Sequence, residues 1–85
     1  MNYCVYMIQS RRKGRYISYV GYTKDLKKRL KLHNSSKGAK FTKGNYWILV
    51  YKKLYISKID AMKAEYSLKK NYKLRKKLKY NFNKK

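Results

Sequence analysis

The sequence predicts one small domain of the α/β class (α+β type), in which helices flank a mainly antiparallel three-stranded sheet. Three apolar runs rich in tyrosine and valine have the length of strands, and the segments between and after them place apolar residues at helical spacing. The 85 residues contain no proline and no evident linker, which suits a single modest core. Three short strands cannot bury both of their faces alone, so helices must cover the sheet. The expected order is β-β-α-β-α-α.

The first two strands are expected at residues 3–8 and 16–22, which are dense in aromatic and β-branched residues. The polar run at residues 11–15 contains Gly14 and predicts a turn, so the two strands should form an antiparallel hairpin. Residues 46–51 are almost wholly apolar and too few for a typical helix. They favour a buried central strand.

The first helix is expected at residues 24–34, where Leu26, Leu30 and His33 follow at spacings of four and three, and Thr23 is the expected N-cap. A second helix is expected at residues 57–71, begun by the capping sequence that starts at Ser57.

Between these helices, residues 35–45 should form a loop rich in Gly, Ser and Lys, with room for one helical turn. A further basic helix is expected at residues 72–80, anchored by Leu74 and Leu78. The domain would then span residues 1–80, and residues 81–85 would form a frayed basic tail.

The charge predicts a polyanionic partner. Lys and Arg number 25 against three acidic residues, which gives a formal net charge of +22. Nucleic acid is the first candidate partner and an anionic membrane surface the second. A genome rich in A/T codons would also enrich lysine, which outnumbers arginine 20 to 5. A particular arginine is therefore more informative than a particular lysine.

Several classes of protein are disfavoured. The lone Cys4 leaves no partner for an internal disulfide or a multi-cysteine zinc site, and its apolar surroundings predict burial. No run of about 18 apolar residues exists, so no membrane span is expected. The first residues lack the features of a signal peptide, which makes the cytoplasm the default location. A monomer or weak dimer is expected.

The three acidic residues differ in what explains them. Asp25 is expected in the first turn of one helix, and Asp60 resembles the acidic member of a capping box with Ser57. Glu65 lies two turns into the second helix. Ile59, Met62 and Tyr66 form one stripe of that helix and Ala61, Glu65 and Leu68 the adjacent one, so Glu65 sits at the edge of an apolar face. A mid-helix glutamate is usually solvated or paired, so its neighbours must decide its role.

Two short motifs supply those neighbours. Cys4-Val5-Tyr6 on the first strand and Tyr19-Val20-Gly21 on the second are followed by Arg29 and then Glu65. This order resembles the GIY-YIG nuclease family over roughly residues 3–77, and residues 33–44 resemble its small stand-alone bacterial members. The resemblance implies a three-stranded antiparallel sheet flanked by helices. It also implies cleavage of DNA phosphodiesters with one divalent metal ion, usually Mg²⁺, with Mn²⁺ as an alternative.

The resemblance also assigns roles. Tyr6 and Tyr19 match the two motif tyrosines, one of which helps to activate the attacking water. Arg29 matches the arginine that stabilises the scissile phosphate, His33 a histidine of some branches, and Glu65 the single metal-binding carboxylate. Residues expected to contact nucleic acid are Gly21, at which backbone must approach closely, and Lys37, Lys40, Lys43, Lys69 and Lys70.

The chain departs from the family pattern at several positions. Cys4 replaces the first motif's glycine, and Val5 and Val20 replace the isoleucines of the two motifs. Tyr22 stands where several relatives carry lysine, which leaves open whether a lysine lies beside the attacking water. The loop lacks the proline common near Gly44 and has Trp47 close by, which we interpret as a change in packing.

The chemistry of phosphodiester hydrolysis requires the same residue types. It needs an activated water and stabilisation of the charge that develops on phosphorus, and arginine's planar fork fits phosphate oxygens. Because Asp25 and Asp60 are assigned to helix ends, only Glu65 is free, which favours a one-metal site. Taken singly, each of these residues has an ordinary interpretation as a packed or solvated side chain. The alternatives are a non-catalytic basic nucleic-acid-binding module and a membrane-surface or ribosome-associated protein that uses residues 69–85.

Overall fold

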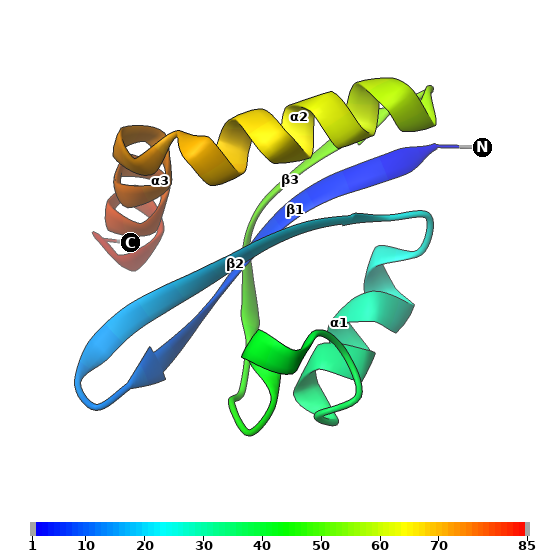
Figure 1. Cartoon of the computed structure of the whole chain (residues 1–85). Helices are drawn as coiled ribbons and strands as arrows, with labels where there is room; N and C mark the ends of the chain where they lie inside the picture. Colours follow the sequence, from blue (N-terminus) through cyan, green and yellow to red (C-terminus); the bar gives the residue numbers. More distant parts are fainter. Residues whose placement is uncertain (1, 85) are drawn as a thin grey trace.

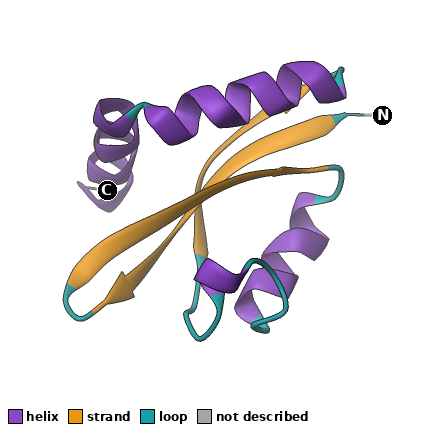
Figure 2. Ribbon diagram, in the orientation of Figure 1, coloured by secondary structure: helices purple, strands orange, loops and turns teal. Residues whose placement is uncertain are grey.

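The computed structural model describes residues 2–84. A three-stranded sheet lies between helices, with α2 and α3 on one side and α1 on the other (Figure 1). The class and the order β-β-α-β-α-α expected from the sequence are confirmed (Figure 2). The elements are β1 (Tyr3–Arg12), β2 (Arg15–Thr23), α1 (Leu26–Asn34), the 3-10 turn η1 (Lys40–Thr42), β3 (Ile48–Tyr55), α2 (Lys58–Lys70) and α3 (Tyr72–Lys84).

The sheet is antiparallel throughout, with strand order β2-β1-β3. The prediction that the third apolar run forms the central strand was therefore wrong, because β3 is an edge strand and β1 is central. Every residue from Cys4 to Ser10 is buried, while no residue of β3 is fully buried. A short apolar run does not reveal which strand has two neighbours, since an edge strand can be equally apolar.

The β1–β2 hairpin turns at Lys13 and Gly14, both of which have positive φ angles (50° and 78°). Two successive left-handed residues match the right-handed twist of the flanking strands and allow a tight two-residue turn. The strands accordingly extend further toward the turn than the sequence predicted, to Arg12 and from Arg15.

Side chains of β1 alternate between the two faces of the sheet. Val5 and Met7 pack with Val20 against Ala61 and Leu68 of α2. On the other face, Cys4, Tyr6 and Ile8 pack with Trp47 against Leu26 and Leu30 of α1. This alternation places Tyr6 on the α1 side of the sheet.

Capping residues fix where the helices begin. The Asp25 side chain accepts a hydrogen bond from Lys28 N, so Asp25 is the N-cap of α1 and the prediction of Thr23 was wrong. Thr23 instead accepts a bond from Asp25 N at 3.2 Å. Ser57 caps α2 as predicted by accepting from Asp60 N at 3.3 Å. Both aspartates therefore lie at helix ends, as the sequence indicated.

The buried face of α2 is narrower than the sequence suggested. Ala61 and Leu68 are buried and Glu65 is half-buried beside them, as expected. The neighbouring stripe is exposed, with 64% of Ile59 and 58% of Tyr66 accessible, because the small sheet contacts only one side of the helix.

The C-terminal helix is longer than expected. Residues expected to fray after Tyr80 continue α3 to Lys84. The amide groups of Gln9 and Asn83 exchange two hydrogen bonds, of 2.7 and 3.1 Å, which hold α3 against the central strand. Across residues 2–84, no helix combines the length and apolar character that crossing a membrane requires.

Candidate active site

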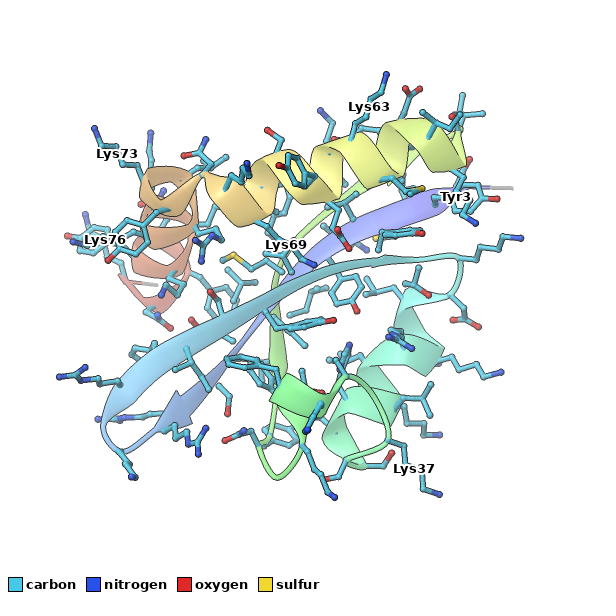
Figure 3. The ribbon with its side chains drawn as sticks, viewed as in Figure 1. Tyr3, Lys37, Lys63, Lys69, Lys73 and Lys76 are labelled. Carbon is cyan, nitrogen blue, oxygen red and sulfur yellow. The ribbon has the colours of Figure 1, made fainter. Side chains whose placement is uncertain are left out.

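A cleft of about 440 Å³ opens where β1, β2, α1 and α2 meet. Five of the residues predicted to form the site line it. These are Tyr6, Tyr19, Gly21, Arg29 and Glu65, and the other lining residues are Tyr3, Tyr22, Thr23, Lys24 and Lys58. Figure 3 shows Tyr3 at the start of β1, beside the start of α2. The fold thus brings residues from four elements around one space.

His33 lies behind this cleft and is completely buried. Its Nε2 is 2.8 Å from the Tyr6 hydroxyl, and its Nδ1 is 2.9 Å from Thr42 Oγ1. The Thr42 hydroxyl is also 2.7 Å from the carbonyl oxygen of Ala39, to which it donates its only proton. His33 Nδ1 must therefore be the donor toward Thr42.

This assignment fixes the donor and acceptor in every hydrogen bond that links Tyr6, His33, Thr42 and Ala39. A neutral imidazole that carries its proton on Nδ1 has a free lone pair on Nε2. The Tyr6 hydroxyl therefore donates to His33 Nε2. The polar groups run in one direction, from Tyr6 through His33 and Thr42 to the Ala39 carbonyl, with each donor matched to an acceptor.

Burial keeps both ends of the Tyr6–His33 bond neutral. Burial raises the pKa of Tyr6 to about 12, and interaction with Arg29 opposes that rise. Burial, together with the nearby positive charge of Arg29, lowers the pKa of His33 below its usual value of 6.5. At neutral pH, Tyr6 is therefore a phenol and His33 is an imidazole able to accept a proton.

Arg29 lies one helical turn before His33 on α1. Its Nε is buried and has no hydrogen-bond partner among the described residues. The one ion pair within residues 2–84 joins Glu65 and Lys69, so no carboxylate occupies Arg29. Its guanidinium is available to an anion in the cleft.

Glu65 provides the one acidic side chain that lines the cleft. Its side chain is 19% exposed, and Oε1 is 3.5 Å from Lys69 Nζ. Figure 3 shows Lys69 extending from α2 toward the sheet, whereas Lys63 points away from it. Within residues 2–84, no three His, Cys, Asp or Glu side chains gather as metal ligands.

This donor set fits a hard divalent cation held through a single carboxylate. Mg²⁺ commonly uses one or two carboxylates and completes its shell with water and substrate phosphate. A site that needs several protein ligands, as zinc does, does not fit.

The lysines expected to contact nucleic acid are distributed differently from the cleft-lining residues. Lys37, Lys40 and Lys43 are exposed on the loop that carries Thr42. Lys69 reaches Glu65, and Lys70 lies 4.6 Å from the centre of the exposed Tyr66 ring.

Sequence reasoning missed Lys24 and Lys58, which line the cleft, and Thr42, which orients His33. Nothing in the sequence distinguishes these two lysines from the other lysines, which number 20 in all. Nothing around Thr42 in the expected loop indicated a contact with His33.

Gly21 packs closely against the side chain of Tyr6. It lies directly opposite Tyr6 in the β1–β2 pairing, and a Cβ atom there would be 2.6 Å from the Tyr6 hydroxyl and 2.8 Å from its ring. The group that approaches the backbone is thus the Tyr6 phenol. A Cβ atom at Gly38 would likewise collide with the His33 ring.

Gly21→Ala should therefore displace Tyr6 and break its bond to His33. We expect unfolding free energy to fall by about 1–3 kcal/mol, as for other overpacked cores. Thermal or urea unfolding would measure this loss. An unfolding midpoint identical to that of wild type would show that Tyr6 has free space beside it.

The fold and cleft define a class of protein, the GIY-YIG catalytic domain. A model of that domain matches residues 2–81, and the chain belongs to this family. More particularly, it groups with the UPF0213 family of small bacterial proteins. The solution NMR structure of the UPF0213 protein BH0048 from Bacillus halodurans is 38% identical, with a TM-score of 0.50, and the match covers 95% of this chain and 84% of that one.

Two curated relatives agree over a shorter region. UPF0213 protein YazA from Bacillus subtilis is 49% identical over 53 residues, which cover 61% of this chain and 54% of the relative. A UPF0213 protein from Streptococcus pneumoniae serotype 4 is 48% identical over 52 residues, covering 60% and 52%. The chain thus matches about half the length of each.

Proposed function

We propose that the protein is a metal-dependent endonuclease that nicks DNA by hydrolysing a phosphodiester bond with one metal ion. The observation that carries the proposal is the meeting of three groups in one cleft. These are the Tyr6 phenol with its hydrogen bond to His33, an Arg29 side chain without a carboxylate partner, and the lone carboxylate Glu65. The net charge of +22 favours a polyanionic substrate.

Glu65 would hold the metal ion, Mg²⁺ or Mn²⁺, together with water and a phosphate oxygen. A bound divalent ion supplies two kinds of chemistry here, acidification of water and neutralisation of charge on the phosphate. Arg29 would bind the same phosphate with its guanidinium fork and stabilise the charge that develops on its oxygens.

Tyr6 is the tyrosine best placed to accept a proton from the attacking water. Its hydroxyl donates to His33 Nε2, so the phenol can pass its own proton to His33 as it takes one from water. Thr42 holds the Nδ1 proton in place and keeps Nε2 ready. Tyr19 lines the cleft with its ring 5.1 Å from that of His33, and no hydrogen bond links the two residues.

Lys24 and Lys58 also line the cleft, so a positive charge can reach the phosphate although Tyr22 stands where several relatives carry lysine.

Supercoiled plasmid tests the proposed function, because one nick converts it to the open circular form. Conversion is expected with Mg²⁺ and not with EDTA.

Lys69 should compete with the metal ion for Glu65, since its ammonium lies 3.5 Å from the same carboxylate. Without nucleic acid, Lys69→Gln is expected to tighten Mn²⁺ binding by roughly 2- to 5-fold, the range of a partly exposed ion pair. Lys70→Gln removes the same charge one residue further along and provides the control. Calorimetric or EPR titration would measure both, and equal changes would show a general charge effect.

A non-catalytic nucleic-acid-binding module is the second candidate, because most of the lysines lie on exposed surface outside the cleft. Such a module would bind DNA with a steep salt dependence and would leave plasmid intact at every Mg²⁺ concentration.

A further inference from the structure

Phe41 is an exposed aromatic residue at the rim of the candidate active site. It is 52% accessible and lies in η1, between Lys40 and Thr42. Its ring stacks on that of Tyr19, with centroids 6.2 Å apart and planes inclined by 21°. Tyr19 itself lines the cleft, so a single side chain separates Phe41 from the space around Arg29 and Glu65.

The Phe41 ring packs against residues that are themselves held in place. Trp47 is fully buried with its ring centroid 6.1 Å from that of Phe41, and its indole N–H donates to the Thr42 carbonyl at 2.9 Å. The next residue, Thr42, is anchored through His33 and Ala39. Because Tyr19 and Trp47 contact only part of the ring, the rest is presented to solvent in a defined position.

The surroundings of Phe41 determine which ligand suits it. Lys40 precedes it in the sequence, Lys43 follows two residues later and Lys37 lies on the same loop, all of them exposed. An exposed aromatic ring on a lysine-rich loop is the combination that binds single-stranded nucleic acid, where bases stack on the ring and phosphates meet the lysines. A purely apolar partner would have to leave these ammonium groups unpaired.

We propose that Phe41 is a stacking site for a nucleobase adjacent to the phosphodiester in the cleft. The position of that phosphodiester rests on the proposed function, whereas the stacking site rests on the exposed ring. A base can stack on Phe41 only if one of its faces is free. The site therefore favours nucleic acid that has an unpaired or unstacked base beside the bound phosphate.

The test is binding of a fluorescein-labelled 12-nucleotide single-stranded DNA, followed by anisotropy in EDTA so that nothing is cleaved. Phe41→Ala is expected to weaken binding about 5- to 100-fold, the range for loss of one stacked base. Phe41→Trp should retain affinity. Phe41→Leu keeps apolar volume against Tyr19 without a stacking face, and should bind nearly as weakly as the alanine variant.

Two comparisons separate stacking from other effects. Tyr46→Ala removes a 73% exposed aromatic nearby in the chain that is not stacked on Tyr19, and should change affinity little. A strand of abasic sites should bind wild type and Phe41→Ala alike, because it has phosphates but no bases. The slope of affinity against salt should be unchanged in Phe41→Ala, since no phosphate contact is lost.

Equal losses in Phe41→Ala and Tyr46→Ala, or an equal loss on the abasic strand, would overturn the stacking site. Full affinity in Phe41→Leu would do so as well. Because these measurements use no metal, failure of the nuclease proposal would be seen separately, as intact plasmid in Mg²⁺.

Discussion

Replacement of Glu65 by glutamine is expected to lower the rate of Mg²⁺-dependent DNA nicking by at least about 10²- to 10³-fold. That range is typical for loss of one positioned electrostatic group, and loss of the metal ligand should cost no less. Without metal, DNA affinity should stay equal or rise slightly, because the variant removes a negative charge from beside the phosphate. Plasmid nicking with Mg²⁺ and anisotropy in EDTA would measure the two effects.

Asp60→Asn is the matched control for this variant. It makes the same change of charge on the same helix, in the first turn and outside the residues that line the cleft. Nicking by Asp60→Asn should remain close to wild type. If Glu65→Gln and Asp60→Asn behaved alike, Glu65 would have no special role.

Tyr6→Phe is expected to reduce nicking by about 10²- to 10⁴-fold, the contribution typical of a positioned acid or base. The variant removes the only described hydrogen-bond donor to His33 Nε2 and leaves the ring in place. Tyr22→Phe makes the same change on another tyrosine of the cleft and should have a much smaller effect. Single-turnover nicking rates of the two variants would measure this difference, and equal rates would contradict a special role for Tyr6.

The pH dependence provides a second readout of Tyr6. Protonation of His33 removes the acceptor for the Tyr6 proton, so the wild-type rate should fall as pH drops through the His33 pKa, which burial places below 6.5. Tyr6→Phe should lose this acidic limb, because His33 then has no proton to accept. A limb that persists unchanged in Tyr6→Phe would point to another titrating group.

Local signals in the sequence predicted most of the fold. Dense runs of aromatic and β-branched residues on either side of the polar turn at Gly14 located the β1–β2 hairpin, and Ser57 located the start of α2. The start of α1 was misplaced because Thr23 and Asp25 are both good caps two residues apart, and only their hydrogen bonds distinguish them. The edge position of β3 depends on pairing between distant segments, which composition does not encode.

The residues that line the cleft were predicted better than the contacts behind them. Tyr6, Arg29 and Glu65 stood out through motif order and the scarcity of acids. The Tyr6–His33–Thr42 chain depends on where the loop before β3 folds back, and nothing local to Thr42 indicates it. The exposed stripe of Ile59, Met62 and Tyr66 was misjudged because helical spacing identifies an apolar side of α2 but not which side meets the sheet.

Hydrolysis of phosphodiester bonds with a divalent metal ion is the activity that we propose for this cleft. The most direct test is the conversion of supercoiled plasmid to open circles by the wild-type chain in Mg²⁺ and in EDTA, with Glu65→Gln purified identically to expose any contaminating nuclease. A catalytic cleft should give open circles with wild type in Mg²⁺, and no open circles with wild type in EDTA or with the variant. Intact plasmid with wild type at every Mg²⁺ or Mn²⁺ concentration, or equal nicking by Glu65→Gln, would contradict it.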